Sequence, residues 1–210
     1  TPLKGRYCHL EPIDVKHSQD LFEAWYCIDD DRDWTYFHIN RPKTLFQTEH
    51  YLKSLASSAD PMFYAVICQA THKAVGSVAL QRIDPANGVL EIGYINWSPL
   101  MKRTSMSTEA IYLLLCYIFD TLHYRRCAWK CDSLHESAIN AAERLGFQYE
   151  GLFRNMQVSN GRNRDVRWYS IIEEEWPEMR NAMAWWLSPA NHDETGKQKQ
   201  KLAELLPKKS

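Results

Sequence analysis

The sequence predicts an α+β fold in which helices flank a mixed, mostly antiparallel sheet. The chain has 210 residues, of which 45% are hydrophobic, enough for one sizeable core and most simply a single domain with an appendage. Short β-rich runs alternate with apolar helical patterns, and no internal repeat is present. One helical pattern, Ser105 to Leu122, separates the strand patterns Val89 to Trp97 and Arg125 to Ser133. A right-handed crossover of this kind makes those two strands a central parallel pair.

The first half of the chain predicts an antiparallel meander preceded by a strand and two helices. The turn DPANG, Asp84 to Gly88, is the strongest signal, because proline and glycine together end one strand before the next begins. The expected elements are a strand at Arg6–Pro12, helices at His17–Ile28 and Thr44–Ala56, and strands at Phe63–Gln69, Ala74–Ile83 and Val89–Trp97.

The second half predicts a helix, a hairpin and a C-terminal helix. A helix at Glu136–Leu145 stops at Gly146, and strands Gln148–Val158 and Asp165–Ile172 flank a turn at Asn160–Asn163. Beyond Glu175, a helix that begins at Pro177 and ends at Pro189 carries an apolar stripe, and the polar stretch from Asn191 to Ser210 is expected to be mobile apart from one short leucine-containing helix. We therefore expect a domain over residues 1–176 and a helical extension with a polar tail over 177–210.

Composition narrows the class of function. A formal net charge of −1 argues against an extended nucleic-acid surface. The six cysteines form neither a CxxC pair nor a Cys/His metal spacing, so reduced thiols and no metal are expected. No segment approaches the apolar length of a membrane span, and the N-terminus lacks the pattern of a signal peptide. These features predict a cytoplasmic protein, either a monomer or a homodimer, whose partners are small or local.

The segment from Ile92 to Ala110 is the most informative stretch. A β-rich run breaks at a proline, and a basic, hydroxyl-rich turn then opens a long apolar helix. The first amides of a helix have no intrahelical acceptor, and the helix dipole adds positive charge there, so a phosphate is stabilised. Lys102 and Arg103 reinforce that sign. The alternative is an ordinary strand-to-helix connection with solvated basic side chains.

Several ordered motifs carry a family resemblance. EIGYINWSP followed by TEA, then RRCAWKCDSLHESAINAAERLGFQYEGLFR and NGRNRDVRWYSI, together resemble the GNAT acyltransferase superfamily over about Tyr7 to Pro177. The most similar branch contains the ribosomal-protein alanine acetyltransferases. The resemblance implies a GNAT-type sheet whose parallel strand pair forms a cofactor cleft. It also implies acetyl-CoA as acyl donor, and transfer of the acetyl group to a primary amine of a small molecule or a protein N-terminus by direct attack in a ternary complex.

The resemblance also assigns cofactor-binding residues. The family's pyrophosphate loop, Q/R-x-x-G-x-G/A, falls on Lys102 to Ser107, with serine at both glycine positions, Ser105 and Ser107. A tyrosine that protonates the leaving thiolate in many members corresponds to Ala142. Asn140 is a possible replacement for missing polar groups on the same helix, or an ordinary exposed residue. The full implied set is Ile95, Asn96, Trp97, Lys102, Arg103, Thr104, Ser105, Met106, Ser107, Thr108, His135 and Asn140.

Three residues are candidates for the proton chemistry. An alkylamine must lose a proton before it attacks, which costs roughly 4 kcal/mol at neutral pH, and a carboxylate or histidine can accept that proton. Glu91 matches the Glu of the family's EIGY motif, and burial is expected to raise its pKa. The alternative for Glu91 is a structural pair with a cross-strand Lys or Arg. Asp132 and His135 follow the second parallel strand, where ligand crevices open. A dedicated base is also dispensable if positioning supplies the rate.

The acceptor is expected at the run DDDRDWTYFHINRP, Asp29 to Pro42. Its aspartates, represented by Asp31, and the aromatic residues Trp34 and Tyr36 can attract and enclose a cationic amine, with Glu91 beside them and Arg162 at the rim. The alternative is a solvated loop with its aromatics in the core. Two classes of function follow from the sequence: an N-acetyltransferase, or a non-catalytic acyl-CoA-binding sensor or pseudoenzyme with the same fold.

Overall fold

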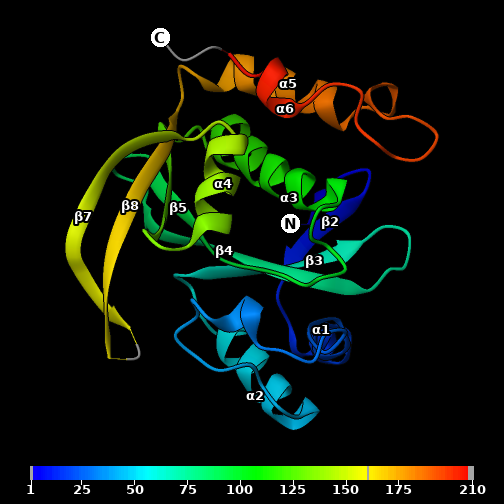
Figure 1. Cartoon of the computed structure of the whole chain (residues 1–210), viewed down its shortest axis with the longest axis vertical. Helices are drawn as coiled ribbons and strands as arrows, with labels where there is room; N and C mark the ends of the chain where they lie inside the picture. Colours follow the sequence, from blue (N-terminus) through cyan, green and yellow to red (C-terminus); the bar gives the residue numbers. More distant parts are fainter. Residues whose placement is uncertain (1, 160, 208–210) are drawn as a thin grey trace. The chain divides into compact units, whose positions relative to one another are not determined.

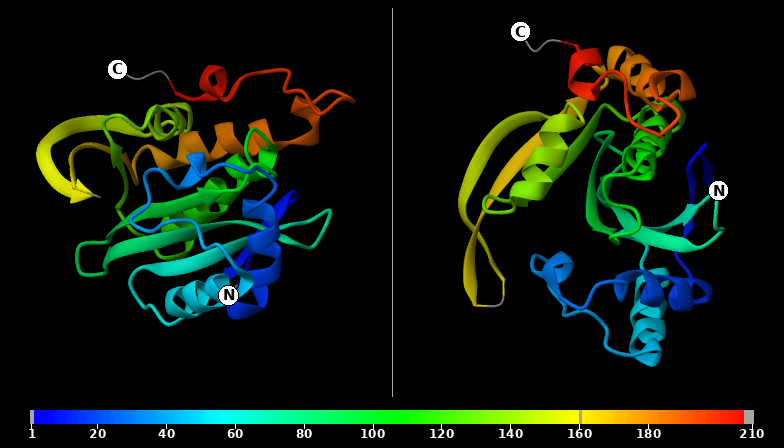
Figure 2. Two further views of the ribbon diagram at one scale, coloured as in Figure 1. Left: turned by 60° about the horizontal axis from the view of Figure 1, so that its bottom comes forward. Right: turned by 45° about the vertical axis from the view of Figure 1, so that its right-hand side comes forward.

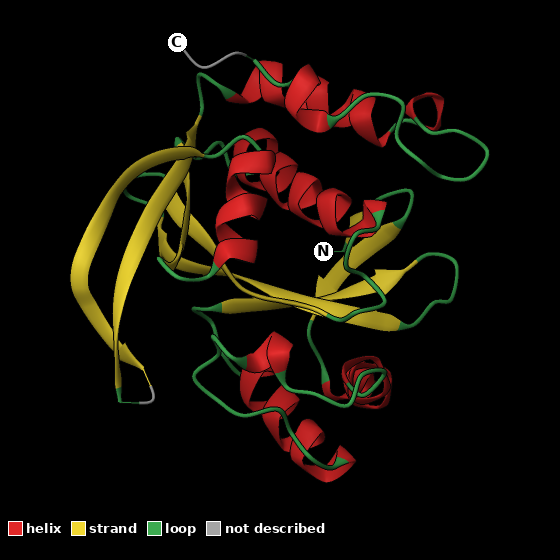
Figure 3. Cartoon of the chain, viewed as in Figure 1, coloured by secondary structure: helices red, strands yellow, loops and turns green. Residues whose placement is uncertain are grey.

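The computed structural model describes residues 2–159 and 161–207, which contain both helices and strands (Figures 1 and 3). The chain forms two compact units. The first comprises Thr1–Asp84 and Leu90–Leu114, and the second comprises Pro85–Val89 and Leu115–Ser210.

Strands of the first unit follow one another in the order β1-β2-β3-β4-β5. The first three pairings are antiparallel, with Leu10 opposite Val66 and Tyr64 opposite Val78. Every residue of β3 after Met62 is buried, which explains its unbroken apolar sequence. The strands are β1 (Leu3–Lys4), β2 (Cys8–Pro12), β3 (Met62–Cys68), β4 (Ala74–Asp84) and β5 (Val89–Trp97).

Helices cover both faces of these strands. Two of them, α1 and α2, lie on one face, and the N-terminal part of α3 lies on the other, as Figures 1 and 2 show. Thr44 caps α2 by accepting the N–H of Gln47, so this helix begins where the sequence predicts. The helical segments are the 3-10 turn Val15–His17, α1 (Ser18–Trp25), the 3-10 turn Arg32–Trp34, α2 (Leu45–Ala56) and α3 (Ser105–Cys116).

The core beneath α1 and α2 is aromatic and aliphatic. Trp25 and Trp34 meet edge to face with ring centroids 4.9 Å apart, and Leu21 and Leu52 are fully buried beside them. Alternate residues of β3, such as Phe63 and the two that follow on the same face, complete the cluster: Ile13, Leu21, Trp25, Trp34, Leu52, Phe63, Ala65, Ile67, Ala74 and Ala79.

The second unit contains three strands in the order β6-β8-β7, with both pairings antiparallel. β7 and β8 form the long curved hairpin of Figure 1. Gly146, which follows the cap residue Leu145 at the end of α4, has a φ of +91°, and this is the left-handed stop that the sequence predicts. The elements are the π-helical turn Tyr117–Thr121, β6 (Arg126–Asp132), α4 (Glu136–Arg144), β7 (Gln148–Ser159), β8 (Arg162–Ile172), α5 (Trp176–Leu187), the 3-10 turn Pro189–Asn191 and α6 (Leu202–Leu205).

The first strand and first helix are shorter than predicted. Arg6 and Tyr7 lie outside β2 because the carboxylate of Glu109 accepts their backbone N–H groups, each at 2.7 Å, and also the N–H of Cys8 at 2.8 Å. The helix expected to reach Ile28 ends at Trp25. The Trp25 carbonyl accepts a hydrogen bond from the side chain of Arg41 at 3.0 Å. In both places a distant side chain replaces backbone partners.

Two predictions in the second unit need correction. β8 begins at Arg162, so Arg162 and Asn163 are strand rather than turn, and the strand starts three residues earlier than the predicted Asp165. Asn160 of the predicted turn lies outside the described residues. The helix expected to reach Leu122 ends its α-helical part at Cys116 and finishes in a π-helical turn.

The C-terminal segment is more ordered than its polar composition predicts. Leu202 in α6 is buried. Asn191, also buried, donates side-chain hydrogen bonds to the carbonyls of Trp186 and Gln200, both at 3.2 Å. These bonds tie the polar stretch back to α5, whose predicted apolar stripe is buried as expected.

Candidate functional site

The turn between β5 and α3, in the first unit, is where the sequence predicts a phosphate seat. The Ser98 carbonyl accepts the N–H groups of Met101 and Lys102 at 3.0 and 3.1 Å, and the Thr104 hydroxyl donates to the Met101 carbonyl at 2.6 Å. These bonds close the turn, and α3 begins at Ser105. The Ser107 N–H donates to the Thr104 carbonyl at 3.3 Å. The amides before it come too early in α3 to have an acceptor within the helix, so this end of the helix suits an anion.

Serine is compatible with the backbone at both positions where the family motif has glycine. Ser105 and Ser107 lie inside α3, in the right-handed helical region, whereas the left-handed residue of the turn is Arg103, with a φ of +60°. The Ser107 hydroxyl donates to the Thr104 carbonyl at 2.9 Å. The absence of glycine therefore imposes no conformational penalty on this turn.

Lys102 and Arg103 are exposed, but the two cations differ in their surroundings. The Lys102 ammonium forms an ion pair with Asp33, which belongs to the acidic run expected near the acceptor. The structure thus joins a residue of the phosphate seat to a residue of the acceptor segment within one unit. Of the other predicted residues in this turn, Met106 is half-buried and Thr108 is buried.

Strand β5 carries a local distortion at Tyr94, which has a φ of +49° within the strand. A non-glycine residue in that region is strained, and such residues gather at functional sites. Tyr94 lies edge-on to Phe63 at 5.2 Å, and burial, together with the nearby Tyr94, raises the pKa of Tyr51 to about 12. The next residues, Ile95 and Trp97, are half-buried.

Asn96 is 3% exposed, and its Oδ1 has no hydrogen-bond partner among the described residues. A buried amide oxygen without a donor is costly, so this position suits a donor from a ligand or an ordered water.

Glu91 is buried, and the structure pairs it with β4. Gln81 donates from Nε2 to Glu91 Oε1 at 2.6 Å, and Arg82 Nε lies 3.5 Å from Glu91 Oε2. The side chain of Glu91 is 2% exposed and that of Arg82 is 53% exposed. This is the cross-strand pair that the structural alternative predicts, and the carboxylate stays buried on the same strand that carries the strained Tyr94.

In the second unit, Asp132 and His135 lie where β6 passes into α4. The Asp132 carboxylate accepts the Leu134 N–H at 2.8 Å and forms an ion pair with Arg164 at 2.9 Å. His135 is half-buried and precedes the first residue of α4, with its carbonyl accepting the N–H of Ile139. Asp132 therefore stabilises the turn as well as lying at the predicted place.

The remaining predicted residues of α4 and the hairpin are on the surface or in the core. Asn140 is exposed on α4, and Ala142, at the position of the family's tyrosine, is fully buried. Arg162 is exposed at the start of β8, opposite Ser159. Arg164, two residues on, is the arginine whose side chain is tied to Asp132.

The acidic run is largely neutralised by its own neighbours. Asp30 pairs with Arg32, and Asp31 pairs with Arg41 at 2.7 Å. Trp34 is buried in the core, as the alternative to an acceptor role predicts, while Tyr36 is half-buried. The acidic run therefore has less unpaired negative charge with which to attract an amine than its sequence indicates.

Sequence reasoning gave no role to Arg41, which organises the acceptor segment. Arg41 is 8% exposed, lies 4.0 Å over the ring of Tyr26, and donates to the carbonyls of Trp25 and Ile28, both at 3.0 Å. Buried arginine with carbonyl partners is a rigid organiser. The one available signal was an arginine next to Pro42 in an otherwise aromatic and acidic segment.

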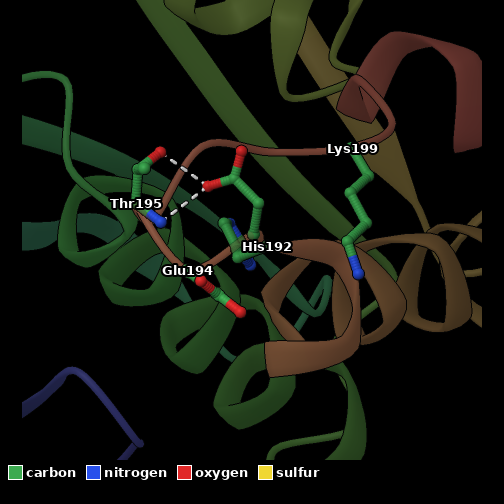
Figure 4. A pocket seen from close by; sticks show the side chains of 5 residues that line it. His192, Glu194, Thr195 and Lys199 are labelled. Carbon is green, nitrogen blue, oxygen red and sulfur yellow. Dashed lines mark hydrogen bonds between the residues drawn. The ribbon is translucent and has the colours of Figure 1, made fainter.

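A separate hollow lies in the C-terminal segment (Figure 4) and contains none of the predicted site residues. Asp193 Oδ1 accepts the backbone N–H and hydroxyl of Thr195 at 2.9 and 2.6 Å, which is an ordinary side-chain-to-backbone turn. His192, Glu194 and Lys199 line the rest. These contacts explain the local shape without a ligand.

Across residues 2–159 and 161–207, no helix is both long and apolar enough to cross a membrane. That same part of the chain has no group of three or more His, Cys, Asp or Glu side chains arranged to hold a metal ion.

Comparison with known sequences gives a consistent family. A model described as an acetyltransferase (GNAT) domain matches residues 8–148. "Uncharacterized N-acetyltransferase p20" of Bacillus licheniformis is 29% identical over 117 residues, which cover 54% of this chain and 63% of that protein. "Putative ribosomal N-acetyltransferase YdaF" of Bacillus subtilis (strain 168) is 31% identical over 102 residues, which cover 48% and 55%. The chain thus spans less than two thirds of the length of these two relatives.

Solved structures are similar over more of the chain. A GCN5-related N-acetyltransferase from Brucella melitensis is 44% identical with a TM-score of 0.95, covering 98% of this chain and 93% of that one. A probable acetyltransferase (GNAT family) from Chromobacterium violaceum is 33% identical with a TM-score of 0.77, covering 84% and 88%. The predicted fold class, a mostly antiparallel mixed sheet with one parallel strand pair and flanking helices, is confirmed.

Proposed function

We propose that this chain, which belongs to the GNAT acetyltransferase domain family, is an acetyl-CoA-dependent N-acetyltransferase. It moves the acetyl group to a primary amine of a small molecule or a protein N-terminus, by direct attack on the thioester in a ternary complex. Its catalytic domain comprises residues 1–176, residues 177–210 form a helical extension, and it works in the cytoplasm as a monomer or homodimer.

The observation that carries this proposal is the turn that opens α3. The exposed basic residues Lys102 and Arg103 lie between the end of β5 and the N-terminus of α3, and the serines at the start of α3 are accommodated without strain. The pyrophosphate of acetyl-CoA would be held by the first amides of α3, by those two cations and by nearby hydroxyls. The backbone of Ile95 to Trp97 would pair with the pantetheine arm as an added strand does.

The chemistry needs a deprotonated amine and a stabilised oxyanion. Glu91 is the first candidate for proton acceptor, directly or through water, because it is a carboxylate on β5 three residues before the distorted Tyr94. A backbone N–H of β5 would stabilise the oxyanion, and the distorted backbone at Tyr94 is where such a group would leave its ladder. Asp132 and His135 would orient the acceptor or a water molecule. The acidic run would contribute Asp31 and Tyr36 to the acceptor site, and Trp34, which is buried in the core of the first unit, would support the segment that carries them.

Calorimetric titration with acetyl-CoA tests the donor site. The variant Ser105→Asp/Ser107→Asp places negative charge in the first turn of α3, where it stabilises the helix but repels phosphate. We expect wild type to bind and the variant to bind at least about tenfold more weakly, which corresponds to 1.4 kcal/mol. Phe46→Asp, at an exposed position in the first turn of α2, is the matched control and should leave binding unchanged. No binding by wild type would overturn the proposal.

Turnover of Glu91 variants tests the base. Glu91→Gln removes both the carboxylate and its ion pair, whereas Arg82→Gln removes only the ion pair. If Glu91 accepts the proton, kcat falls by about 100-fold in Glu91→Gln alone, while acetyl-CoA binding is kept. Equal losses in the two variants would mean that Glu91 acts as the structural partner of Arg82.

The second candidate function is a non-catalytic acyl-CoA-binding sensor. It is favoured by the pairing of Glu91 with Arg82 and of Asp132 with Arg164, and by alanine at position 142. Both functions require acetyl-CoA binding, so turnover separates them: acetyl-CoA bound tightly, with no acetylation across a panel of amines and N-terminal peptides, would favour the sensor.

A further inference from the structure

Two cysteines of the first unit face each other across β2 and β3. Cys8 and Cys68 are direct partners in the antiparallel register. The Gln69 N–H donates to the Tyr7 carbonyl at 2.9 Å, so the hydrogen bond between the strands joins the residues next to the cysteines. The two cysteines therefore occupy a non-hydrogen-bonded position of the ladder. Partners at such a position have Cα atoms about 4.5 Å apart and side chains on the same face. That spacing falls within the range that a disulfide requires.

The two thiols have different environments. Cys68 is 9% exposed at the end of β3, whereas Cys8 is 0% exposed. Burial alone would raise the pKa of the Cys68 thiol, but hydrogen bonds from Thr71 and from the backbone of Ala70 bring that pKa below its ordinary value. Burial and the nearby Glu109 carboxylate raise the pKa of Cys8 well above its ordinary value. Cys68 is thus the thiol that an oxidant reaches first.

We propose that Cys8 and Cys68 form an intramolecular disulfide when the protein meets a hydroperoxide. The Cys68 sulfur attacks the peroxide oxygen, the O–O bond breaks, and Cys68 becomes a sulfenic acid with release of water or an alcohol. The Cys8 sulfur then displaces the sulfenic oxygen, which leaves as water with the thiol proton. Two thiols and one peroxide thus give one disulfide, one water molecule, and a second water molecule or an alcohol. The two thiols are oxidised, and they supply the two electrons that reduce the peroxide.

The bridge also bears on the turn that opens α3. In the reduced protein the Cys8 thiol contacts the Met106 carbonyl, with sulfur and oxygen 3.7 Å apart. Met106 is in the first turn of α3. Oxidation removes the proton of the Cys8 thiol, so Cys8 can no longer donate to the Met106 carbonyl.

The chain contains its own negative control. Cys127 and Cys131 are also buried and share one face of β6, but they are four residues apart in the same strand. At about 3.3 Å per residue their Cα atoms are roughly 13 Å apart, which is too far for a disulfide. Cys27 is exposed, so Cys27→Ser is the background in which bonds between molecules are suppressed.

The test is peptide mapping of the full-length Cys27→Ser protein after hydrogen peroxide, with trypsin digestion under non-reducing conditions. Trypsin separates Cys8 into the peptide Tyr7–Lys16 and Cys68 into Ser54–Lys73, so a bridge joins two otherwise separate peptides. We expect that joined peptide, with the loss of two hydrogen atoms, to be the dominant oxidised product and to vanish on reduction. Peptides containing Cys127 and Cys131 should stay reduced.

Cys8→Ala, in the same background, should abolish the joined peptide and leave a Cys68 sulfenic acid that dimedone traps. Cys68→Ala should abolish both products. Circular dichroism checks that each variant is folded. The Cys27→Ser protein keeps both Cys8 and Cys68, so its result does not depend on a substitution in the core. The proposal is overturned if the folded Cys27→Ser protein accumulates sulfinic acid at Cys68, or no oxidation at all, without the joined peptide.

Discussion

Replacing Glu109 by glutamine is expected to destabilise the fold by about 3 kcal/mol. The carboxylate is 4% exposed and accepts the N–H groups of Arg6 at Oε1 and of Tyr7 and Cys8 at Oε2. Glutamine keeps one acceptor oxygen. The orientation that keeps more hydrogen bonds leaves the amide oxygen at the Oε2 position, where it accepts from Tyr7 and Cys8. The amide nitrogen then takes the Oε1 position and faces the Arg6 N–H, so two donors oppose each other and this hydrogen bond is lost.

The magnitude follows from the lost and weakened bonds. A buried donor left without an acceptor costs about 1–3 kcal/mol, and each bond that changes from a charged to a neutral acceptor loses roughly 1 kcal/mol. Removing the buried charge returns part of this by lowering the desolvation cost. A net loss of about 3 kcal/mol corresponds to a fall in Tm of roughly 6–12 °C for a chain of this size.

Thermal and urea unfolding followed by circular dichroism measure the effect. Glu49→Gln makes the same chemical change at an exposed position of α2 and should stay within about 0.5 kcal/mol of wild type. The reasoning is refuted if Glu109→Gln and Glu49→Gln are equally stable, because the three hydrogen bonds would then contribute nothing net.

Two further substitutions probe the first unit. Gly5→Ala places a methyl group 2.5 Å from the Glu109 carboxyl carbon, so unfolding measurements should show a loss of about 1–3 kcal/mol in stability. Gly151→Ala is the control and should change stability little, because no atom lies within 4 Å of its added methyl group. Equal effects of the two substitutions would contradict the packing argument. Asp33→Asn removes the ion-pair partner of Lys102, which frees the ammonium for phosphate, and calorimetry should find acetyl-CoA binding up to about fivefold tighter, with pantetheine, which lacks phosphate, unaffected. Weaker acetyl-CoA binding by this variant would mean that Asp33 positions Lys102 rather than competing for it.

Elements bounded by strong local signals are predictable from the sequence. β5 runs from Val89 to Trp97 as predicted, because a proline-and-glycine turn precedes it and Pro99 follows it. The helix before Gly146 is likewise placed to within one residue at its end. In such segments the nearest neighbours along the chain decide the structure.

Features set by distant side chains escape local reasoning. The early end of the predicted first strand depends on Glu109, which is 103 residues from Arg6. The ion pair between Lys102 and Asp33 joins residues that are 69 positions apart in the sequence. The lysine of the predicted phosphate seat and the acidic run are therefore partners rather than isolated charges. Which charges among the predicted site residues are already paired depends on tertiary structure, and the sequence alone does not show it.

The helical backbone at Ser105 and Ser107 has a consequence for how relatives of this chain are recognised. Because neither position needs a left-handed conformation, the backbone of this turn is open to serine or alanine as well as to glycine. A motif search that insists on glycine at these two positions selects for one solution among several small residues. Chains with a hydroxyl-bearing turn would be passed over by such a search although their backbones trace the same path.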